Sequence, residues 1–468
     1  MKAIVGEEIV LEDFTPEAEK FFEDKLTFSN PEYYKKVGMG KWAGNTPEKI
    51  RLIQRKGNNL IIPYGMLPIV FQNSKQFENI YSRNLCALSG IFDYESEIKT
   101  YEYQEEAVQT ALRKRQGVIV APCGSGKTMI GLEIAARIGG RTLWLTHTQD
   151  LLNQSKDRAL SCFGMSERKF GTITGGKVDI GEAITFATVQ TMSKIDLEKV
   201  RDCFDVVITD ECHHVAGSPT KIMMFWRVIS NLSARYKFGL TATPKRSDGL
   251  TPCMYALIGP KIYEIGQEEV SGTTCPVDVT IKKTHYFPDL DKVLMPDGTL
   301  SYSRFINEIV RDRARNDMIV ADIADICSRN ETCIVLTDRI EHIEILKRKL
   351  DEKGISASSL SAASSKRAKS EREFALYALR QKQTNVLIAT YALAKEGLDV
   401  QNLDNIIFAT PQKNETIVTQ SAGRVARKAD GKEIGHVIDY EDAFDMLASW
   451  QRKRNRIYNK LGFTILEQ

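Results

Sequence analysis

A glycine-rich segment that joins an apolar run to a helical pattern is the feature that most constrains this chain. Residues 117–120 are typical of a buried strand, and residues 129–136 have the pattern of a helix. Glycines between them let successive backbone N–H groups face one anion, and the start of the following helix adds partial positive charge. A chance Gly-Lys-Thr at a turn is the alternative, and the flanking strand and helix argue against it.

We therefore expect a phosphate-binding loop that holds a nucleotide. Its members are Pro122, Cys123, Gly124, Ser125, Gly126, Lys127 and Thr128. In such a loop Lys127 reaches the β- and γ-phosphates, and the hydroxyl of Thr128 holds Mg²⁺.

Composition excludes several classes of protein. A length of 468 residues exceeds one ordinary domain, and a formal charge of +3 is close to balance. The nine cysteines are scattered without a Cys-x-x-Cys pair, which disfavours a zinc ribbon and fits a reducing compartment. The first residues turn acidic at once, without the apolar core of a signal peptide, and we see no apolar run long enough to cross a membrane. We expect a soluble, cytoplasmic protein with no membrane partner.

The order of apolar runs predicts the fold class. Short strand-like runs alternate with helix-like stretches between about 101 and 240, and again between about 332 and 409. This alternation predicts parallel sheets with helices on both faces, and ligands of such sheets bind at the carboxyl ends of the strands. We expect an α/β protein with a small α+β accessory domain at 1–95, followed by parallel-sheet domains at 96–272 and 273–468.

Two adjacent carboxylates follow the apolar run at 206–208. Asp210 is expected to hold Mg²⁺, and Glu211 to polarise the water that attacks the γ-phosphate. The following Cys-His-His could instead bind a metal, but no second cluster of ligands accompanies it in the sequence.

A basic pattern near the C-terminal end suits the same chemistry. Gln420, Arg424 and Arg427 have the spacing i, i+4, i+7, which predicts one helical face. Arginines on that face could cross a cleft between domains and stabilise charge in the transition state of phosphoryl transfer. The alternative is a helix with surface arginines. Another basic run, at 451–456, is either a contact with a nucleic-acid backbone or a solvated helix face, and we favour the latter.

The accessory domain has a segment that is both basic and aromatic. Between residues 33 and 56 only Glu48 opposes seven basic residues, and Tyr33, Tyr34 and Trp42 lie among them. Basic side chains suit phosphates and aromatic faces suit bases, so the candidate contacts are Lys35, Lys36, Lys41 and Trp42. A solvated face over an aromatic mini-core explains the same composition equally well.

Taken together, these motifs resemble those of superfamily 2 helicases and translocases. The resemblance rests on the segments 121–128, 210–213, 240–244 and 420–427, in this order. The double histidine and the run at 242–249 resemble the branch of XPB- and UvsW-type DNA repair and recombination motors. The resemblance implies two tandem RecA-like domains that use ATP and Mg²⁺, in a bacterial or phage-infected cytosol.

Residue roles follow from the resemblance. Gln104 would read the adenine edge, and Thr241–Thr243 would couple hydrolysis to movement of the strand. The residues implied to contact nucleic acid are Thr146, His147, Thr148, Thr188, Gln190 and Thr390. Gly397 and Asp399 would approach the nucleotide. Cys123 stands where the family usually has threonine, and Thr148-Gln149 stands where a proline often precedes the glutamine.

The implied function is that of an ATP-dependent DNA helicase or translocase. It would act as a monomer on single-stranded and on branched or duplex DNA, in repair, recombination or replication, and would move 3′ to 5′. An RNA helicase, the motor subunit of a restriction or defence nuclease assembly, and an inactive scaffold are the alternatives. The intact Lys127, Glu211 and arginines argue against the scaffold.

Overall fold

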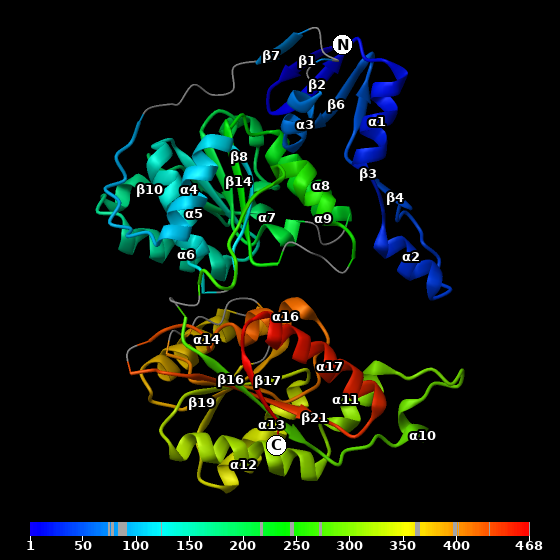
Figure 1. Cartoon of the computed structure of the whole chain (residues 1–468), viewed down its shortest axis with the longest axis vertical. Coiled ribbons are helices and arrows are strands. Elements are labelled where there is room, and N and C mark those ends of the chain that lie inside the picture. The colour runs from blue at the N-terminus through cyan, green and yellow to red at the C-terminus, as the bar shows by residue number, and fades with distance from the viewer. Residues whose placement is uncertain are drawn as a thin grey trace. The chain divides into compact units, whose positions relative to one another are not determined.

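A computed structural model describes this chain in two compact units, Met1–Gly266 and Gln267–Gln468 (Figure 1). The residues outside the description are 74, 76–78, 83–90, 123, 216–218, 244–247, 271–273, 361–365, 396–399, 401, 430 and 468. The region before residue 95 belongs to the first unit.

The first unit begins with a sheet in the strand order β5-β6-β2-β1-β7. Its neighbours pair antiparallel except β1 and β7, which are parallel. The strands are β1 (Lys2–Val5), β2 (Glu8–Glu12), β5 (Gln54–Lys56), β6 (Asn59–Pro63) and β7 (Asn79–Ser82). The helices α1 (Pro16–Leu26) and α3 (Leu67–Gln72) accompany them, with a 3₁₀ turn, η1, at Tyr64–Met66. The expected small α+β region is thus confirmed, although β1 and β2 were not predicted.

A basic arm, defined here as residues 30–48, leaves this region on a two-stranded stalk. The stalk pairs β3 (Thr27–Ser29) antiparallel with β4 (Lys49–Arg51). The arm contains helix α2 (Pro31–Gly38), which buries none of its residues and lies apart from the sheet (Figure 1). Because this helix has no buried face, its apolar side chains remain in water.

The second layer of the first unit is a parallel sheet that carries the phosphate loop. Its order is β11-β10-β12-β9-β13-β14-β8-β15, with parallel neighbours except the hairpin of β10 and β11. The strands are β8 (Gln116–Val120), β9 (Thr142–Thr146), β10 (Phe170–Thr174), β11 (Lys177–Asp179), β12 (Ile184–Thr188), β13 (Val206–Thr209), β14 (Tyr236–Thr241) and β15 (Lys261–Glu264). Central strands such as β9 and β12 are buried throughout, because helices cover both faces.

The helices of this layer are α4 (Glu102–Lys114), α5 (Lys127–Ile138), α6 (Gln149–Cys162), α7 (Val189–Met192), α8 (Pro219–Ser230) and α9 (Thr251–Ile258). Short 3₁₀ turns lie at η3 (Glu167–Lys169), η4 (Leu197–Val200) and η5 (Cys212–Val215). Thr148 and Thr188 cap α6 and α7, each accepting a backbone N–H through its hydroxyl.

The two layers of the first unit share one hydrophobic core. The core runs from Ala3 and Ile9 in the small sheet to Leu257 in α9. Trp226 Nε1 donates to Glu8 Oε1 at 2.9 Å. A Cβ atom on Gly65 would lie 2.3 Å from the carbonyl oxygen of Ala256, so only glycine permits this contact. The N-terminal sheet is therefore packed as part of the first unit.

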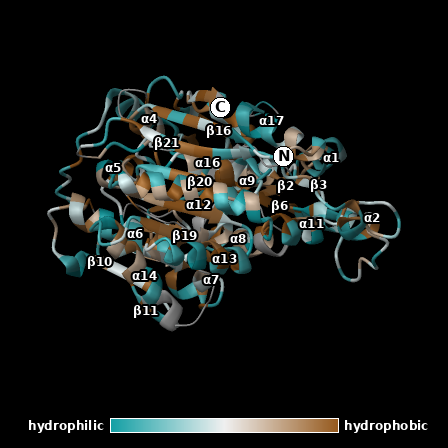
Figure 2. Ribbon diagram, turned by 90° about the horizontal axis from the view of Figure 1, so that it is seen from below, coloured by the Kyte–Doolittle hydropathy of each residue, from teal (hydrophilic) through white to brown (hydrophobic). Residues whose placement is uncertain are grey.

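The second unit is a parallel sheet in the order β18-β19-β17-β20-β21-β16-β22. The strands are β16 (Val277–Lys283), β17 (Cys333–Thr337), β18 (Ala357–Leu360), β19 (Val386–Thr390), β20 (Asn405–Phe408), β21 (Gly435–Glu441) and β22 (Thr464–Glu467). The helices are α10 (Leu290–Val293), α11 (Tyr302–Ile309), α12 (Arg313–Ser328), α13 (Ile340–Glu352), α14 (Lys366–Arg380), α15 (Tyr391–Lys395), α16 (Glu415–Ala422) and α17 (Asp445–Lys460). Figure 2 shows β19 and β20 as hydrophobic segments inside this unit.

The sequence prediction of two parallel-sheet α/β domains is thereby confirmed. Within the described part of the chain, every helix is too short or too polar to span a membrane.

The basic run at 451–456 has a structural role that the sequence did not predict. It lies within α17, and its residue Arg454 is buried rather than exposed. The guanidinium of Arg454 pairs with the carboxylate of Asp439, at 2.7 Å from Nε and 3.0 Å from Nη2. Arg452 and Lys453 are exposed. The interpretation as one solvated face is therefore wrong for Arg454.

Candidate nucleotide and nucleic-acid sites

The phosphate loop stands between β8 and α5, as the sequence predicted. Gly124 and Gly126 have φ values of 88° and 75°, in the left-handed region that favours glycine. Ser125 folds the loop, because its backbone N–H and its hydroxyl both donate to the carbonyl oxygen of Pro122, at 3.2 and 2.7 Å. Lys127 and Thr128 are the first residues of α5. Cys123 lies outside the described residues.

Gln104 supports this loop from α4. Its side-chain Nε2 donates to the carbonyl oxygen of Ser125 at 2.8 Å, and its Oε1 accepts the backbone N–H of Tyr101 at 3.0 Å. A Cβ atom on Gly126 would lie 2.5 Å from Gln104 Nε2. The residue assigned to the adenine is thus placed directly against the phosphate loop.

The two carboxylates follow β13, the strand next to β14 in the sheet. The backbone N–H of Asp210 donates to Leu145 at 2.9 Å, which continues the pairing with β9. Glu211 has a φ of 47°, unusual for a residue with a side chain. Its Oε1 lies 3.6 Å from Lys127 Nζ, and its Oε2 lies 3.3 Å from His213 Nδ1. The structure therefore brings Lys127 and Glu211 together at the carboxyl ends of the strands.

Burial and charge act differently on the two carboxylates. Burial raises the pKa of Asp210 to about 7, and the neighbouring charge of Glu211 adds to this shift. For Glu211, burial opposes ionisation, but the charges of Lys127 and His213 overcome it and lower the pKa to about 2. Glu211 is accordingly ionised at neutral pH and can accept hydrogen bonds from a water molecule.

The donors fit a hard divalent cation at the predicted position. Asp210 offers a buried carboxylate, and Thr128 offers a hydroxyl at the start of α5. Mg²⁺ prefers such oxygen ligands, and a cation beside Asp210 would favour its ionised form. Among the residues described, no group of three or more His, Cys, Asp or Glu is arranged to hold a metal, so a metal site built on Cys212-His213-His214 finds no support.

The segments expected to contact nucleic acid end neighbouring strands. Thr146 and Thr188 are the last residues of β9 and β12, which pair in parallel at Thr146↔Thr188. Thr146 Oγ1 donates to the carbonyl oxygen of Thr148 at 2.9 Å, and Gln190 Nε2 donates to that of His147 at 2.9 Å. The structure thus gathers the candidates Thr146, His147, Thr148, Thr188 and Gln190 at one edge of the sheet.

Contacts between histidines at this edge were missed by sequence reasoning. His147 stacks on His214, with ring centroids 3.7 Å apart. His213 Nδ1 lies 2.9 Å from the hydroxyl of Thr241, at the end of β14. No periodicity could have found the stack, since 67 positions separate its members in the sequence.

In the second unit, residues 420–427, called here the arginine segment, do not form the continuous helix that the sequence predicted. Helix α16 ends at Ala422, and residues 423–426 continue in turns, so the expectation that Gln420, Arg424 and Arg427 share one face of a regular helix is wrong. Backbone bonds of Arg424 to Ser421 and of Arg427 to Arg424 span three residues each. This tighter winding follows Gly423, which ends the helix.

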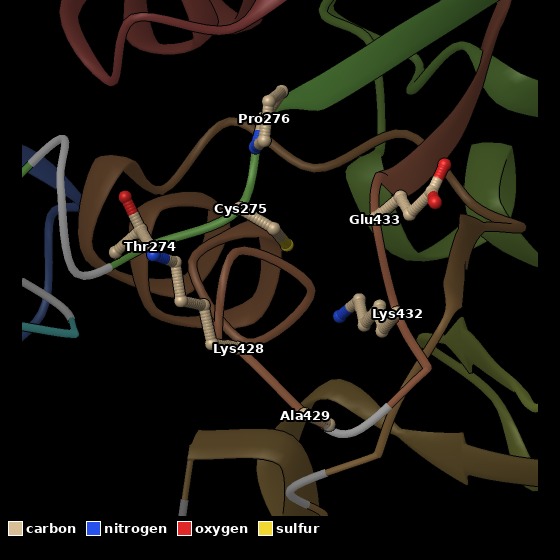
Figure 3. A pocket seen from close by; sticks show the side chains of 7 residues that line it. All are labelled: Thr274, Cys275, Pro276, Lys428, Ala429, Lys432 and Glu433. Atoms are coloured by element: carbon tan, nitrogen blue, oxygen red, sulfur yellow. The ribbon is translucent and has the colours of Figure 1, made fainter.

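The arginine segment is fixed by its neighbours in the second unit. Lys432 Nζ donates to the carbonyl oxygens of Leu403 and Val425, each at 2.5 Å, and to that of Arg427 at 3.2 Å. Thr274 forms an isolated antiparallel bridge with Arg427. A cavity of about 420 Å³ adjoins these contacts, and the side chains of Cys275 and Lys432 point into it (Figure 3). These contacts give the backbone of Arg427 a defined position.

The other predicted residues of this unit are partly described. Thr390 is the last residue of β19 and is buried, and its hydroxyl has no hydrogen-bond partner within the described part of the chain. The Oε1 atom of Gln420 is also buried and has no hydrogen-bond partner among the described residues. Gly397 and Asp399 lie outside the described residues.

The four candidates of the basic arm lie on α2 and on the loop after it. Lys35 is exposed, and Lys36 donates to Thr46 Oγ1 at 2.6 Å and pairs with Glu32 at 3.1 Å. Lys41 is exposed in the following loop, and Trp42 is 90% exposed. An aromatic mini-core that buries Trp42 is therefore excluded.

Comparison with known proteins adds independent findings. Residues 97–246 match the family described as Type III restriction enzyme, res subunit, and residues 318–429 match the helicase conserved C-terminal domain. A protein of Acanthamoeba polyphaga mimivirus, whose name contains the words ATP-dependent RNA helicase, is 26% identical over 75% of this chain. The chain spans 64% of the length of that relative.

Two further similarities concern an archaeal relative and a solved structure. The DNA 3'-5' translocase XPB2 of Sulfurisphaera tokodaii is 26% identical, with 72% of this chain and 80% of the relative covered. The structure of S. cerevisiae Dbp5 bound to RNA and ADP BeF3 matches with a TM-score of 0.58 and 14% identity, over 87% of this chain and 94% of that one. At this identity the latter match concerns the fold alone.

Proposed function

Because this chain belongs to superfamily 2 of the helicases, we propose that it is an ATP-dependent helicase or translocase that acts on DNA. The observation that carries the proposal is the half-buried pair of Lys127 and Glu211, 3.6 Å apart at the carboxyl edge of the first parallel sheet. Phosphoryl transfer needs a cation on the phosphates and a carboxylate that orients the attacking water, and this pair supplies both.

The residues of the first unit take the following roles in this proposal. The phosphate loop binds the triphosphate through its backbone N–H groups and the start of α5. Lys127 moves from Glu211 to the β- and γ-phosphates when ATP enters, and Glu211 then orients water. Thr128 and Asp210 would hold Mg²⁺, which would neutralise charge on the phosphates.

The second unit contributes the arginines. Arg424 and Arg427 stabilise the charge that develops on the γ-phosphate, an effect on the order of 10³–10⁵ in related reactions. Gln420 lies one turn before Arg424, and its buried Oε1 accepts no hydrogen bond from the described residues. Binding of ATP closes the units on one strand, hydrolysis reopens them, and this alternation produces steps along the backbone.

DNA is the proposed track. The similarity to the archaeal relative named as a DNA translocase extends over most of both chains, which favours DNA. The mimivirus relative, named as an RNA helicase, keeps RNA as the second candidate. In this proposal Thr146, Thr148, Thr188 and Thr390 contact phosphates rather than bases, so sequence preference should be slight.

We further propose that the basic arm binds duplex DNA beside the motor and gives preference for forks and four-way junctions. Trp42, with 90% exposure, offers a stacking face, and Lys35 and Lys41 offer charge for phosphates. A second surface tethered to the motor raises the effective concentration of duplex at the strand-binding edge. Remodelling of branched or damaged DNA is the activity that this arrangement would support.

The test is ATP hydrolysis with matched activators: single-stranded DNA, duplex, fork, four-way junction and single-stranded RNA. We expect single-stranded DNA and branched DNA to stimulate hydrolysis more than RNA does. Stronger stimulation by RNA would assign the chain to RNA helicases, and the absence of stimulation by every nucleic acid would contradict the motor function.

The arm has its own test, which leaves the stalk intact. Ser29 and Lys49 are register partners, so residues 30–48 can be replaced by an Asn-Gly turn. We expect this variant to keep hydrolysis stimulated by single strands and to lose junction binding. The variant Trp42→Ala should show part of the loss. Unchanged junction preference in the Asn-Gly variant would remove the arm from the proposal.

A further inference from the structure

Two imidazole rings from distant segments stack in the first unit. His147 follows β9, and His214 lies in the turn η5 after the catalytic carboxylates. Their centroids are 3.7 Å apart with an interplanar angle of 28°, and the ring of His214 lies 4.1 Å from that of His213. Rings at this distance are in van der Waals contact, so neither can shift toward the other without displacing it.

One side of the stack belongs to the edge proposed to hold nucleic acid. The carbonyl oxygen of His147 accepts a hydrogen bond of 2.9 Å from Gln190 Nε2, which ties the turn after β9 to the turn after β12. Thr146 and Thr188, the last residues of these strands, are register partners. A nucleic-acid strand that contacts either turn would therefore press against the backbone of His147.

The other side of the stack belongs to the nucleotide site. His213, beside His214, lies 3.3 Å from Glu211 Oε2, and Glu211 lies 3.6 Å from Lys127. The backbone of Glu211 is in the left-handed region, with φ at 47°, where small changes in the following turn alter its energy. The free space beside the rings, lined also by Gln190 and Asp210, is only about 30 Å³. A free space this small leaves little room for His147 to move without displacing its neighbours in η5.

We propose that the stacked pair His147–His214 is the positioning element that transmits occupancy of the strand-binding turns to Glu211. This inference rests on the proposed function and adds to it the residues by which nucleic acid stimulates hydrolysis. In this role His214 is a positioning residue that acts through Glu211. The coupling requires ring-on-ring contact, not a particular charge.

The experiment measures how a single-stranded oligothymidine stimulates ATP hydrolysis in the full chain. The variants are His147→Ala, His214→Ala, the double variant and His214→Phe, with His285→Ala in the second unit as the control at an exposed histidine. Three quantities are compared: the ratio of hydrolysis with saturating DNA to hydrolysis without it, the affinity for DNA by anisotropy, and the melting temperature.

We expect His214→Ala to lower the stimulation ratio about tenfold, within the usual range of coupling between sites, while affinity for DNA stays near that of wild type. The double variant should lose no more than the larger single loss, because both substitutions remove one contact. His214→Phe retains a flat ring and should restore most of the ratio, which a general loss of stability would not allow.

Three results would overturn the inference: additive losses in the double variant, an unchanged ratio in His214→Ala, or a His214→Phe variant as defective as His214→Ala. Such results with normal stimulation of wild type leave the proposed function intact. A wild type that no nucleic acid stimulates overturns both.

Discussion

At the scale of single residues, burial distinguishes charged side chains that stabilise the fold from those that are accessible to a ligand. Arg454 belongs to a run that looks like a basic patch in the sequence, yet it makes a bidentate pair with Asp439 and a bond of 3.1 Å to the carbonyl oxygen of Gln412. Removing one partner of a buried pair leaves the other charge without compensation, which typically costs about 3–5 kcal/mol.

We therefore predict that Arg454→Ala lowers the melting temperature of the second unit strongly, and that Arg452→Ala on the exposed face of α17 does not. Thermal unfolding followed by circular dichroism measures both. Equal melting temperatures for the two variants would show that the Asp439 pair does not stabilise this unit.

His342 gives a prediction on pH. Its Nδ1 accepts a hydrogen bond of 2.7 Å from Thr337, and its Nε2 donates one of 2.8 Å to Asn316. Burial, with the nearby charge of Arg315, lowers the pKa of His342 to about 3. In the unfolded chain His342 binds a proton near pH 6.5, whereas in the folded chain it stays neutral down to about pH 3. The contribution of neutral His342 to the free energy of unfolding is therefore fully present above pH 6.5 and is lost as the pH falls toward 3.

The expected loss from His342 is about 1.4 kcal/mol per pH unit below pH 6. His342→Gln, which cannot take up a proton, should flatten the dependence of the unfolding free energy on pH between 6 and 4.5. His285→Gln, at an exposed histidine, is the control. Parallel curves for wild type and His342→Gln would contradict the prediction.

At the scale of elements, the phosphate loop depends on one backbone conformation. Gly126 is the N-cap residue of α5 with φ at 75°, and an added Cβ would clash with Gln104 Nε2 at 2.5 Å. A left-handed alanine costs roughly 1–2 kcal/mol before the clash is counted. We predict that Gly126→Ala weakens ATP binding at least tenfold in a titration with a fluorescent analogue, whereas Gly38→Ala, with no neighbour within 4 Å, leaves it unchanged. Equal affinities would mean that the loop tolerates a side chain there.

The same elements show what the sequence could and could not predict. Strands β8, β9, β13 and β19 each contain an apolar run, because parallel strands are buried on both faces, and such runs can be recognised in the sequence. The sequence did not predict that α16 ends before Arg424. The turn that follows Gly423 has a sequence spacing of polar residues that is also compatible with a helix. The stack of His147 on His214 and the contact of Gln104 with Ser125 depend on how distant segments pack, which no local pattern records.

At the scale of the whole molecule, the N-terminal region is inseparable from the first unit. Tyr64 donates to the carbonyl oxygen of Arg235 at 3.1 Å, and Trp226 donates to Glu8 at 2.9 Å. One hydrophobic core also contains residues of both sheets of this unit. We predict that deletion of residues 1–92 exposes this core, lowers the melting temperature and promotes aggregation, whereas the Asn-Gly replacement of the basic arm does not. Thermal unfolding with light scattering compares them. A deletion as stable as the full chain would show that the shared core is dispensable.

The central claim is that Lys127 and Glu211 form the centre of a nucleic-acid-stimulated ATPase. The most direct measurement compares wild type with Glu211→Gln in steady-state ATP hydrolysis at saturating single-stranded DNA, with ATP binding measured on the same preparations. A carboxamide keeps the size of the side chain but cannot orient and polarise water as a carboxylate does. We predict that Glu211→Gln still binds ATP and that its turnover falls roughly 10²–10⁴-fold. Turnover at the wild-type rate would contradict the assignment of this site.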